Sequence, residues 1–123
     1  SVYPPLNSAF QKAISNNDIA VVMRLLESHP VLAITLDHKG NQPIHLAAEK
    51  GNIDLVKCLH KHGANIFALN RQFKSVLSCA VQTNNHLFIR QLIEAFPELL
   101  KGDNQSGFTP LMSAVTMSDD MFA

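Results

Sequence analysis

The chain has 123 residues, of which 46% are hydrophobic, and its ten basic and ten acidic residues give a formal net charge of zero. A general nucleic-acid-binding protein would be expected to be distinctly basic, so this composition disfavours that class. The sequence contains no stretch of about 18 apolar residues, and it therefore predicts no membrane insertion.

The first helix pair is expected directly after a short N-terminal segment. We expect residues 3–5 to lie extended against this pair. Its first helix carries Phe10, Ala13 and Ile14 on one side, and its second helix is expected over residues 19–27. The sequence predicts no protruding turn before this pair, in contrast to the pairs that follow.

A second helix pair is predicted from the residues that start and stop helices within residues 40–66. Pro43 favours a helix start, because its fixed φ angle suits the first helical position, where its missing N–H costs nothing. Gly51 is placed to end that helix, Asn52 can cap the next helix, and Gly63 is placed to end it. Two helices of about eight to ten residues are marginal alone in water, so this pair needs neighbours to pack against.

Further turns and helices follow at the same spacing. Turns are expected over residues 37–42 and 70–75, and the third helix pair over residues 76–83 and 86–95. Residues 103–109 lead into a fourth pair that stops after the first turn of its second helix. Stacked helix pairs require terminal pairs with a polar outer side, and an incomplete fourth pair does not provide one. We therefore expect a longer parent chain. A full-length reading frame that stopped at residue 123 would contradict this expectation.

The helix pairs form an internal repeat. An alanine recurs at intervals of 34, 33 and 34 residues, at Ala13, Ala47, Ala80 and Ala114. Asn17 and Asn84 occupy the position of Gly51 in their own repeats, and asparagine is the residue that best tolerates the left-handed conformation after glycine. A fixed period of this length is typical of stacked repeats that contact only their neighbours.

Two motifs in the second repeat carry a family resemblance. Residues 40–48, GNQPIHLAA, resemble the G-x-T-P-L-H-x-A-A signature of ankyrin repeats, and residues 63–65, GAN, are similar to the G-A-D of the same family. The resemblance covers roughly residues 6–123 and implies an all-α fold, a solenoid of stacked helix-turn-helix repeats with protruding turns. It implies a single domain over residues 1–123, and the repeats run over about 6–36, 37–69, 70–102 and 103–123, the last incomplete.

The third repeat departs from the family pattern more than the second. Phe73 replaces Gly, Val76 replaces Pro and Ser78 replaces His. The sequence leaves two conformations open for Phe73, which can lie exposed or can fold inward to support a turn that has lost its glycine. At His45, in the signature position, the resemblance implies an imidazole that bridges turns through hydrogen bonds.

We expect no catalytic, metal or cofactor site. His60 and His62 are two residues apart and point to different sides of a helix, so we expect them to be exposed and unliganded at its C-terminus. Cys58 and Cys79 lack the spacing of a redox or zinc pair and are interpreted as small buried side chains, which suits a reducing compartment. Ser78 lies in no strained nucleophile elbow. We therefore expect no enzyme activity within this segment, no small-molecule substrate, and an intracellular location, with the cytoplasm favoured over the nucleus.

Binding of another protein is the function that the resemblance implies. Members of the ankyrin-repeat family hold partners with the tips of their turns and the exposed sides of their first helices, which line a concave groove. Transferred position by position, these candidate partner-binding residues are His38, Lys39, Asn41, Glu49, Lys50, Arg71, Gln72, Phe73, Lys74, Gln82, Thr83, Gln105 and Phe108.

The candidate residues are not electrically neutral. Across the second and third repeats they include Lys39, Lys50, Arg71 and Lys74 but only one acidic residue, Glu49. This pattern fits either an unspecific solvated face or a groove that prefers an acidic partner segment. A different function stays open as well, in which this segment is a structural spacer or a substrate-docking arm of an enzyme or effector whose catalytic domain lies outside it.

Overall fold

The computed structural model describes residues 4–102, and its elements are all helical. Gln105 and Phe108, together with the expected fourth repeat, lie outside the described residues. In chain order the helices are α1 Pro4–Ser15, α2 Ile19–Ser28, the 3-10 helix η1 Pro30–Ile34, α3 Pro43–Lys50, α4 Ile53–Lys61, α5 Val76–Gln82, α6 His86–Ala95 and α7 Leu99–Gly102.

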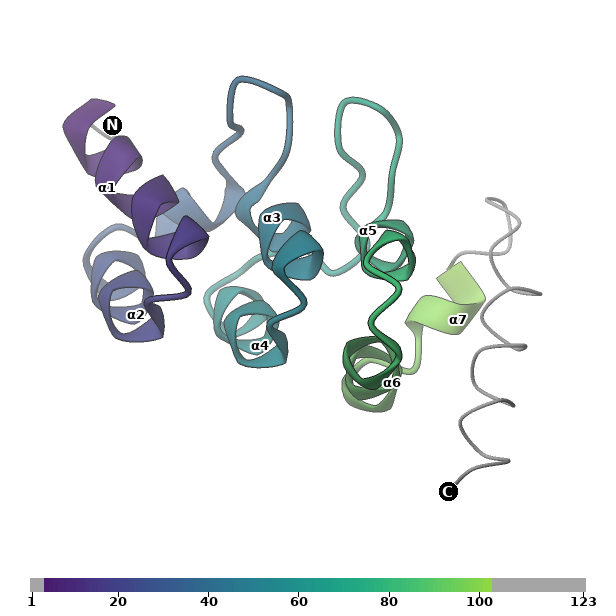
Figure 1. Ribbon diagram of the computed structural model, residues 1–123. Helices are drawn as coiled ribbons and strands as arrows, with labels where there is room; N and C mark the ends of the chain where they lie inside the picture. Colours follow the sequence, from purple (N-terminus) through teal and green to yellow (C-terminus); the bar gives the residue numbers. More distant parts are fainter. Residues whose placement is uncertain (1–3, 103–123) are drawn as a thin grey trace.

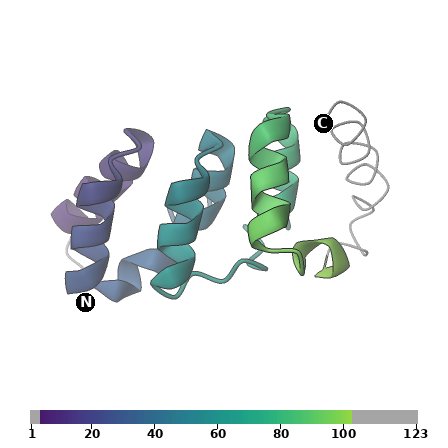
Figure 2. The same cartoon turned by 90° about the horizontal axis from the view of Figure 1, so that it is seen from below.

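The helices form three stacked pairs, α1 with α2, α3 with α4, and α5 with α6. In Figure 1 the first helices of the pairs make one layer, and the second helices lie beneath them. Seen from below, α2, α4 and α6 lie side by side along one row (Figure 2). The segments before α3 and α5 project from the layer of first helices as two long turns (Figure 1). This arrangement confirms the predicted all-α solenoid.

Capping residues set the helix boundaries close to the predicted positions. The Asn52 side chain accepts a hydrogen bond from the Leu55 N–H at 3.2 Å and begins α4, as its position predicted. Gly51 ends α3 in the left-handed conformation, with φ at 67°. Asn17 and Asn84 have φ angles of 56° and 57°, which confirms that asparagine replaces glycine at this turn.

The core runs continuously from pair to pair rather than forming one centre. Ala47, Ala48 and Ala80 are fully buried, and such small side chains let neighbouring helices approach closely. The largest side chains that are fully buried in the described residues are Phe10, Ile14, Leu26, Leu32, Ile44, Leu55, Leu59, Leu77, Phe88, Ile89 and Leu92. Because these residues come from every pair, each repeat is stabilised by burying its apolar side against its neighbours.

Two local features differ from the prediction. Residues 3–5 were expected to be extended, but α1 already begins at Pro4. This part of the prediction is wrong because proline is tolerated throughout the first turn of a helix, where the N–H groups have no helical partner. The 3-10 helix η1 was not predicted either, and it begins at Pro30, directly after the exit from α2.

Gly40 lies where the two protruding turns touch. Its φ angle is 82°, and its carbonyl accepts a hydrogen bond from the Arg71 N–H at 3.1 Å. A Cβ atom at position 40 would collide with the Cβ atom of Arg71. Glycine is therefore required here both by the backbone conformation and by the close approach of the next turn.

We expect Gly40→Ala to lower the free energy of unfolding by about 2 kcal/mol or more, because left-handed strain of about 1–2 kcal/mol adds to the collision. Urea denaturation followed by circular dichroism would measure the change. Gly63→Ala is a matched control, since Gly63 has a φ angle of 107° but a Cβ atom there would meet no other atom within 4 Å. Equal losses for the two variants would show that the approach of Arg71 contributes nothing.

Candidate protein-binding surface

Each protruding turn is closed by one polar side chain. In the first turn, Oδ1 of Asp37 accepts hydrogen bonds from the N–H groups of Lys39 at 2.9 Å and Asn41 at 2.8 Å. In the second turn, Oδ1 of Asn70 accepts from the N–H groups of Gln72 and Lys74, both at 2.9 Å. Asp and Asn favour turns because their short side chains bond to backbone groups a few residues ahead.

The two turns are also bonded to each other. The Asn70 side-chain amide donates to Oδ1 of Asn41 at 2.8 Å, beside the backbone bond from Arg71 to Gly40. Asn41 and Asn70 are only 9% and 7% exposed. Asn41, predicted to touch a partner, therefore uses its side chain to hold the turns together.

His45 fixes the base of the turns, as the resemblance implied. The ring is fully buried, its Nδ1 accepts from the Gln42 N–H at 3.2 Å, and its Nε2 lies 3.0 Å from the Ala68 carbonyl oxygen. Since the Gln42 group can only donate, Nε2 must carry the proton and donate to Ala68. Burial lowers the pKa of His45 below its ordinary value of 6.5, although the Ala68 hydrogen bond and the Glu49 charge act to raise it.

We expect the free energy of unfolding to fall as the pH drops below about 6.5, partly because of His45. The unfolded chain binds a proton at His45 at a higher pH than the folded chain does, so acid favours unfolding. The measurement is a series of urea denaturations from neutral pH to about pH 5, compared with the same series for His45→Gln. The variant should have a shallower slope, because the other histidines are common to both chains. Identical slopes would contradict the assignment.

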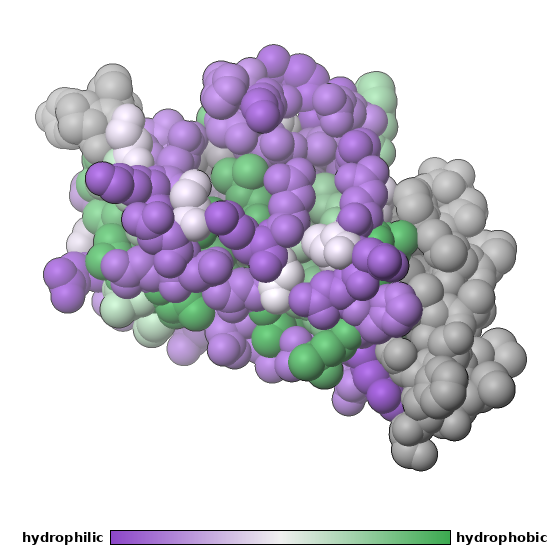
Figure 3. Space-filling model, viewed as in Figure 1, coloured by the Kyte–Doolittle hydropathy of each residue, from purple (hydrophilic) through white to green (hydrophobic). Residues whose placement is uncertain are grey.

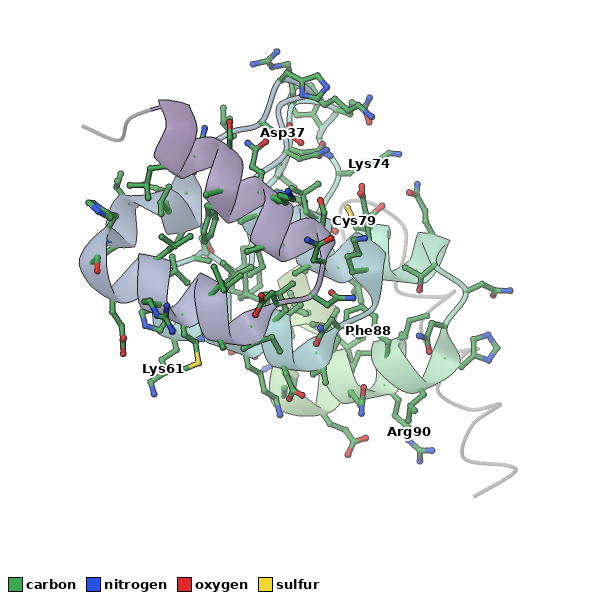
Figure 4. The ribbon with its side chains drawn as sticks, turned by 60° about the vertical axis from the view of Figure 1, so that its left-hand side comes forward. Asp37, Lys61, Lys74, Cys79, Phe88 and Arg90 are labelled. Carbon is green, nitrogen blue, oxygen red and sulfur yellow. The ribbon has the colours of Figure 1, made fainter. Side chains whose placement is uncertain are left out.

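A cleft of about 320 Å³ lies between the turns and the exposed side of α3. Asp37 and Lys74 line this cleft, and Figure 4 shows both of them above Cys79 of α5. Its lining residues are Asp37, His38, Lys39, Asn41, Leu46, Glu49, Asn70, Gln72 and Lys74. The cleft thus brings together six of the predicted residues from two repeats and adds Asp37, Leu46 and Asn70 to them.

Two further predicted residues, Gln82 and Thr83, lie at a second cleft. Glu49, Gln82 and Thr83 line a smaller cleft of about 230 Å³ with Cys79. The Lys74 ammonium lies 3.5 Å from Oε1 of Gln82, which links the second turn to α5. We call the predicted residues that the structure describes the turn face, and they are His38, Lys39, Asn41, Glu49, Lys50, Arg71, Gln72, Phe73, Lys74, Gln82 and Thr83.

The cations of the turn face have no acidic partner within the described part of the chain. Lys39, Lys50 and Arg71 are exposed and Lys74 is half-buried. The ion pair found among residues 4–102 joins Arg90 to Glu94 at 3.7 Å on α6, away from the turns. Figure 3 shows hydrophilic surface over the turns and the first helices. These four positive charges are therefore available to a binding partner.

Phe73 adopts one of the two conformations that the sequence left open. Its side chain is 83% exposed, so it does not fold inward. Its φ angle is 62°, which keeps the left-handed conformation that Gly40 has in the preceding turn. The third repeat therefore retains the turn geometry without the glycine.

Exposed apolar residues in the segments that lead into the two protruding turns were not predicted from the sequence. We call these segments, residues 34–36 and 67–69, the arms of the turns. Ile34 and Leu36 in the first arm are 52% and 51% exposed, and Phe67 and Leu69 in the second arm are 46% and 53% exposed. Ile34 corresponds to Phe67, and Leu36 to Leu69, at the 33-residue spacing of the repeat. In the second segment they alternate with buried Ile66 and Ala68, but residues 66–69 are all apolar, so no polar residue in the sequence marked the exposed side.

The cysteines and histidines that were considered as possible metal ligands contribute instead to packing and local contacts. Cys58 and Cys79 are buried free thiols, and burial raises the pKa of both, that of Cys79 to about 11. His60 is exposed and meets the Phe96 ring edge-on with centroids 4.8 Å apart. His62 was expected to be exposed but is half-buried, with Nδ1 2.9 Å from the Cys58 carbonyl oxygen. Within residues 4–102 no three His, Cys, Asp or Glu side chains gather as metal ligands.

Comparison with known proteins identifies the repeats. Residues 5–70, more than half of the chain, match the family model described as ankyrin repeats in three copies. The chain is 36% identical over 94 residues to the serine/threonine-protein kinase VIK of Arabidopsis thaliana, which covers 76% of this chain and 21% of the kinase. It is 33% identical over 85 residues to Rabankyrin-5 of Mus musculus, covering 68% of this chain and 7% of that protein.

A viral relative adds to this pattern. The chain is 35% identical over 94 residues to the putative ankyrin repeat protein FPV219 of Fowlpox virus, covering 76% of this chain and 21% of that protein. The chain thus spans about a fifth or less of the length of these three relatives.

No helix among the described residues is long and apolar enough to cross a membrane. Ankyrin repeats generally bind other proteins and are typically non-catalytic. Since the family model matches more than half of its residues, the chain belongs to the ankyrin-repeat family.

Proposed function

We propose that this chain is a non-catalytic module that binds another protein through the turn face. The observation that carries the proposal is the set of four cations, Lys39, Lys50, Arg71 and Lys74, which have no carboxylate partner among the described residues. Two of them, Lys39 and Lys74, line a preformed cleft. Unpaired charges around a cleft favour a partner of opposite charge, which would approach faster through long-range attraction. The proposed partner surface is therefore an acidic segment of another protein.

The hydrogen-bonded turns support binding by rigid presentation. Asp37 and Asn70 each hold two backbone N–H groups, and the Asn70–Asn41 and Arg71–Gly40 bonds join the turns. Surfaces that are ordered before binding lose little further conformational entropy when the partner docks. A modest number of contacts then suffices for specific binding.

An intracellular location is part of the proposal. Cys58 and Cys79 are both free and buried, which suits a compartment where thiols stay reduced. The proposal includes no cofactor and no small-molecule substrate, because the function assigned to the turn face is contact with a protein.

A second candidate function is favoured by one comparison. The similarity to a serine/threonine-protein kinase supports the alternative that this segment is a docking arm of a larger enzyme. In that case the turn face would hold a substrate or a regulator for a catalytic domain elsewhere in the parent chain. The parent sequence would separate the two candidates by containing or lacking kinase motifs.

Affinity capture from cell lysate tests the proposal with three forms of the chain. These are the native chain, a turn-face variant with Lys39, Lys50, Arg71 and Lys74 changed to Glu, and a control with Arg24, Lys57, Lys61 and Lys101 changed to Glu. The control residues are all exposed on α2, α4 and α7, so both variants change the net charge equally. Circular dichroism first confirms equal helicity.

The proposal expects a discrete protein that the native chain and the control capture and that the turn-face variant loses. Equal capture by all three forms would contradict the role of the turn face. Loss from the control alone would move the binding surface to α2, α4 and α7.

A further inference from the structure

Phe73 has two features that do not contribute to folding. Its φ angle of 62° lies in the left-handed region, which is strained for L-residues other than glycine. Its side chain is 83% exposed, so little burial offsets that strain. The preceding turn has glycine at the matching position, Gly40, where the same conformation carries no penalty. A strained and exposed aromatic residue on a protruding turn points to a role outside the folded chain.

The backbone around Phe73 is held in a fixed conformation. The Phe73 N–H donates to the Asn70 carbonyl oxygen at 2.9 Å, and the N–H groups on either side of it, from Gln72 and Lys74, bond to the Asn70 side chain. Arg71 is tied to the neighbouring turn through its own N–H. An aromatic side chain on such a frame has only two torsions to order on binding, so contact with it costs little entropy.

Charged and apolar residues of the same turn define the partner. Arg71 and Lys74 lie within two residues of Phe73 and have no carboxylate partner among residues 4–102. Leu69, in the arm of the same turn, is 53% exposed. Aromatic residues and arginine are the residues that most often dominate binding energy at interfaces. The second turn thus combines exposed apolar side chains with positive charges.

We propose that the second turn, residues 69–74, is the main recognition element, and that Phe73 is its anchor. The partner contributes an acidic segment whose large apolar side chains pack against Phe73 and Leu69 while its carboxylates meet Arg71 and Lys74. This inference rests on the proposed function and adds the partner's apolar requirement to its charge. An anionic membrane surface would offer similar charges, but Glu49 and Asp37 in the adjoining cleft disfavour a continuous negative surface.

The test is selection of a phage-displayed library of random peptides on the whole chain. Selected peptides are then labelled, and fluorescence polarisation measures their affinity for the native chain, Phe73→Gly and Leu87→Ser. Leu87 is a matched control, since it is 67% exposed on α6. Urea denaturation of Phe73→Gly checks that folding is kept, which is expected because glycine accepts the left-handed conformation without strain.

The selected peptides should be rich in Asp and Glu and should also carry aromatic or branched aliphatic residues. Phe73→Gly should weaken their binding about tenfold or more, whereas Leu87→Ser should leave it within about twofold. The inference is overturned if no peptide is enriched, if the peptides are basic, or if Phe73→Gly binds them as well as the native chain. Binding to phosphatidylserine vesicles that Phe73→Gly loses would also overturn it, in favour of a membrane.

A further variant separates this inference from the proposed function. If the turn-face variant loses the peptides while Phe73→Gly keeps them, the role of Phe73 is wrong and the proposed function stands. If neither variant changes peptide binding, both are wrong.

Discussion

Phe88→Ala is expected to lower the free energy of unfolding by about 3–5 kcal/mol, the usual cost of truncating a buried phenylalanine. Phe88 is 1% exposed on α6 and points into the interior (Figure 4). A Cβ atom at Gly51 would lie 3.8 Å from the Phe88 ring, so the ring packs against the inter-helix turn of the preceding repeat. Its loss removes contacts between repeats as well as within one, and a solenoid depends on both.

Urea denaturation followed by circular dichroism measures this prediction, and Leu87→Ala is its control. Leu87 precedes Phe88 on the same helix but is 67% exposed, so its truncation should change the free energy of unfolding by no more than about 0.5 kcal/mol. Since small domains have a total stability of about 5–15 kcal/mol, Phe88→Ala should unfold at a clearly lower urea concentration. Similar midpoints for the two variants would show that the packing between repeats is not as described.

Changing Lys39, Lys50, Arg71 and Lys74 to Glu should weaken binding of the captured partner about tenfold or more, mostly through slower association. Dissolved salt screens the attraction between exposed charges, and at 0.1 M ionic strength this attraction falls off over about 10 Å. Raising the salt concentration should therefore slow association of the native chain and have a smaller or opposite effect on the variant. Surface plasmon resonance at several salt concentrations measures both rates.

The control for this prediction carries Glu at Arg24, Lys57, Lys61 and Lys101, which have the same formal charge change. Its association rate should stay within about threefold of the native rate at physiological salt, because these residues lie away from the turns. An equal slowing of both variants would mean that net charge, and not the position of the cations, controls association.

Much of the fold could be predicted because single residues with strong backbone preferences set the starts and ends of its helices. Pro43, Gly51 and Asn52 each have a short list of local conformations, and the structure places a helix start, a left-handed end and a cap at these positions. Asn17 and Asn84 could be matched to Gly51 for the same reason. Local backbone preference and the repeat spacing together were sufficient for these elements.

Other features depend on contacts between repeats, which no local pattern contains. The partner of Asn41 is Asn70, 29 residues away, so its burial could not be predicted from the residues around it. The orientation of Phe73 was left open by the sequence, and it depends on a turn whose backbone is bonded to the preceding repeat through Arg71 and Gly40. Leu36 and Leu69 were missed because apolar residues in an arm were not expected to lie on its exposed side.

The central claim is that a partner docks on the turn face, and chemical-shift mapping of the backbone amides by nuclear magnetic resonance tests it most directly. The captured protein, or a selected peptide, is titrated into the isotopically labelled chain. The largest shift changes are expected at residues 38–41, 49–50 and 71–74, with little change in α2, α4 and α6. Changes concentrated on α2, α4 and α6, with the turns unaffected, would contradict the claim.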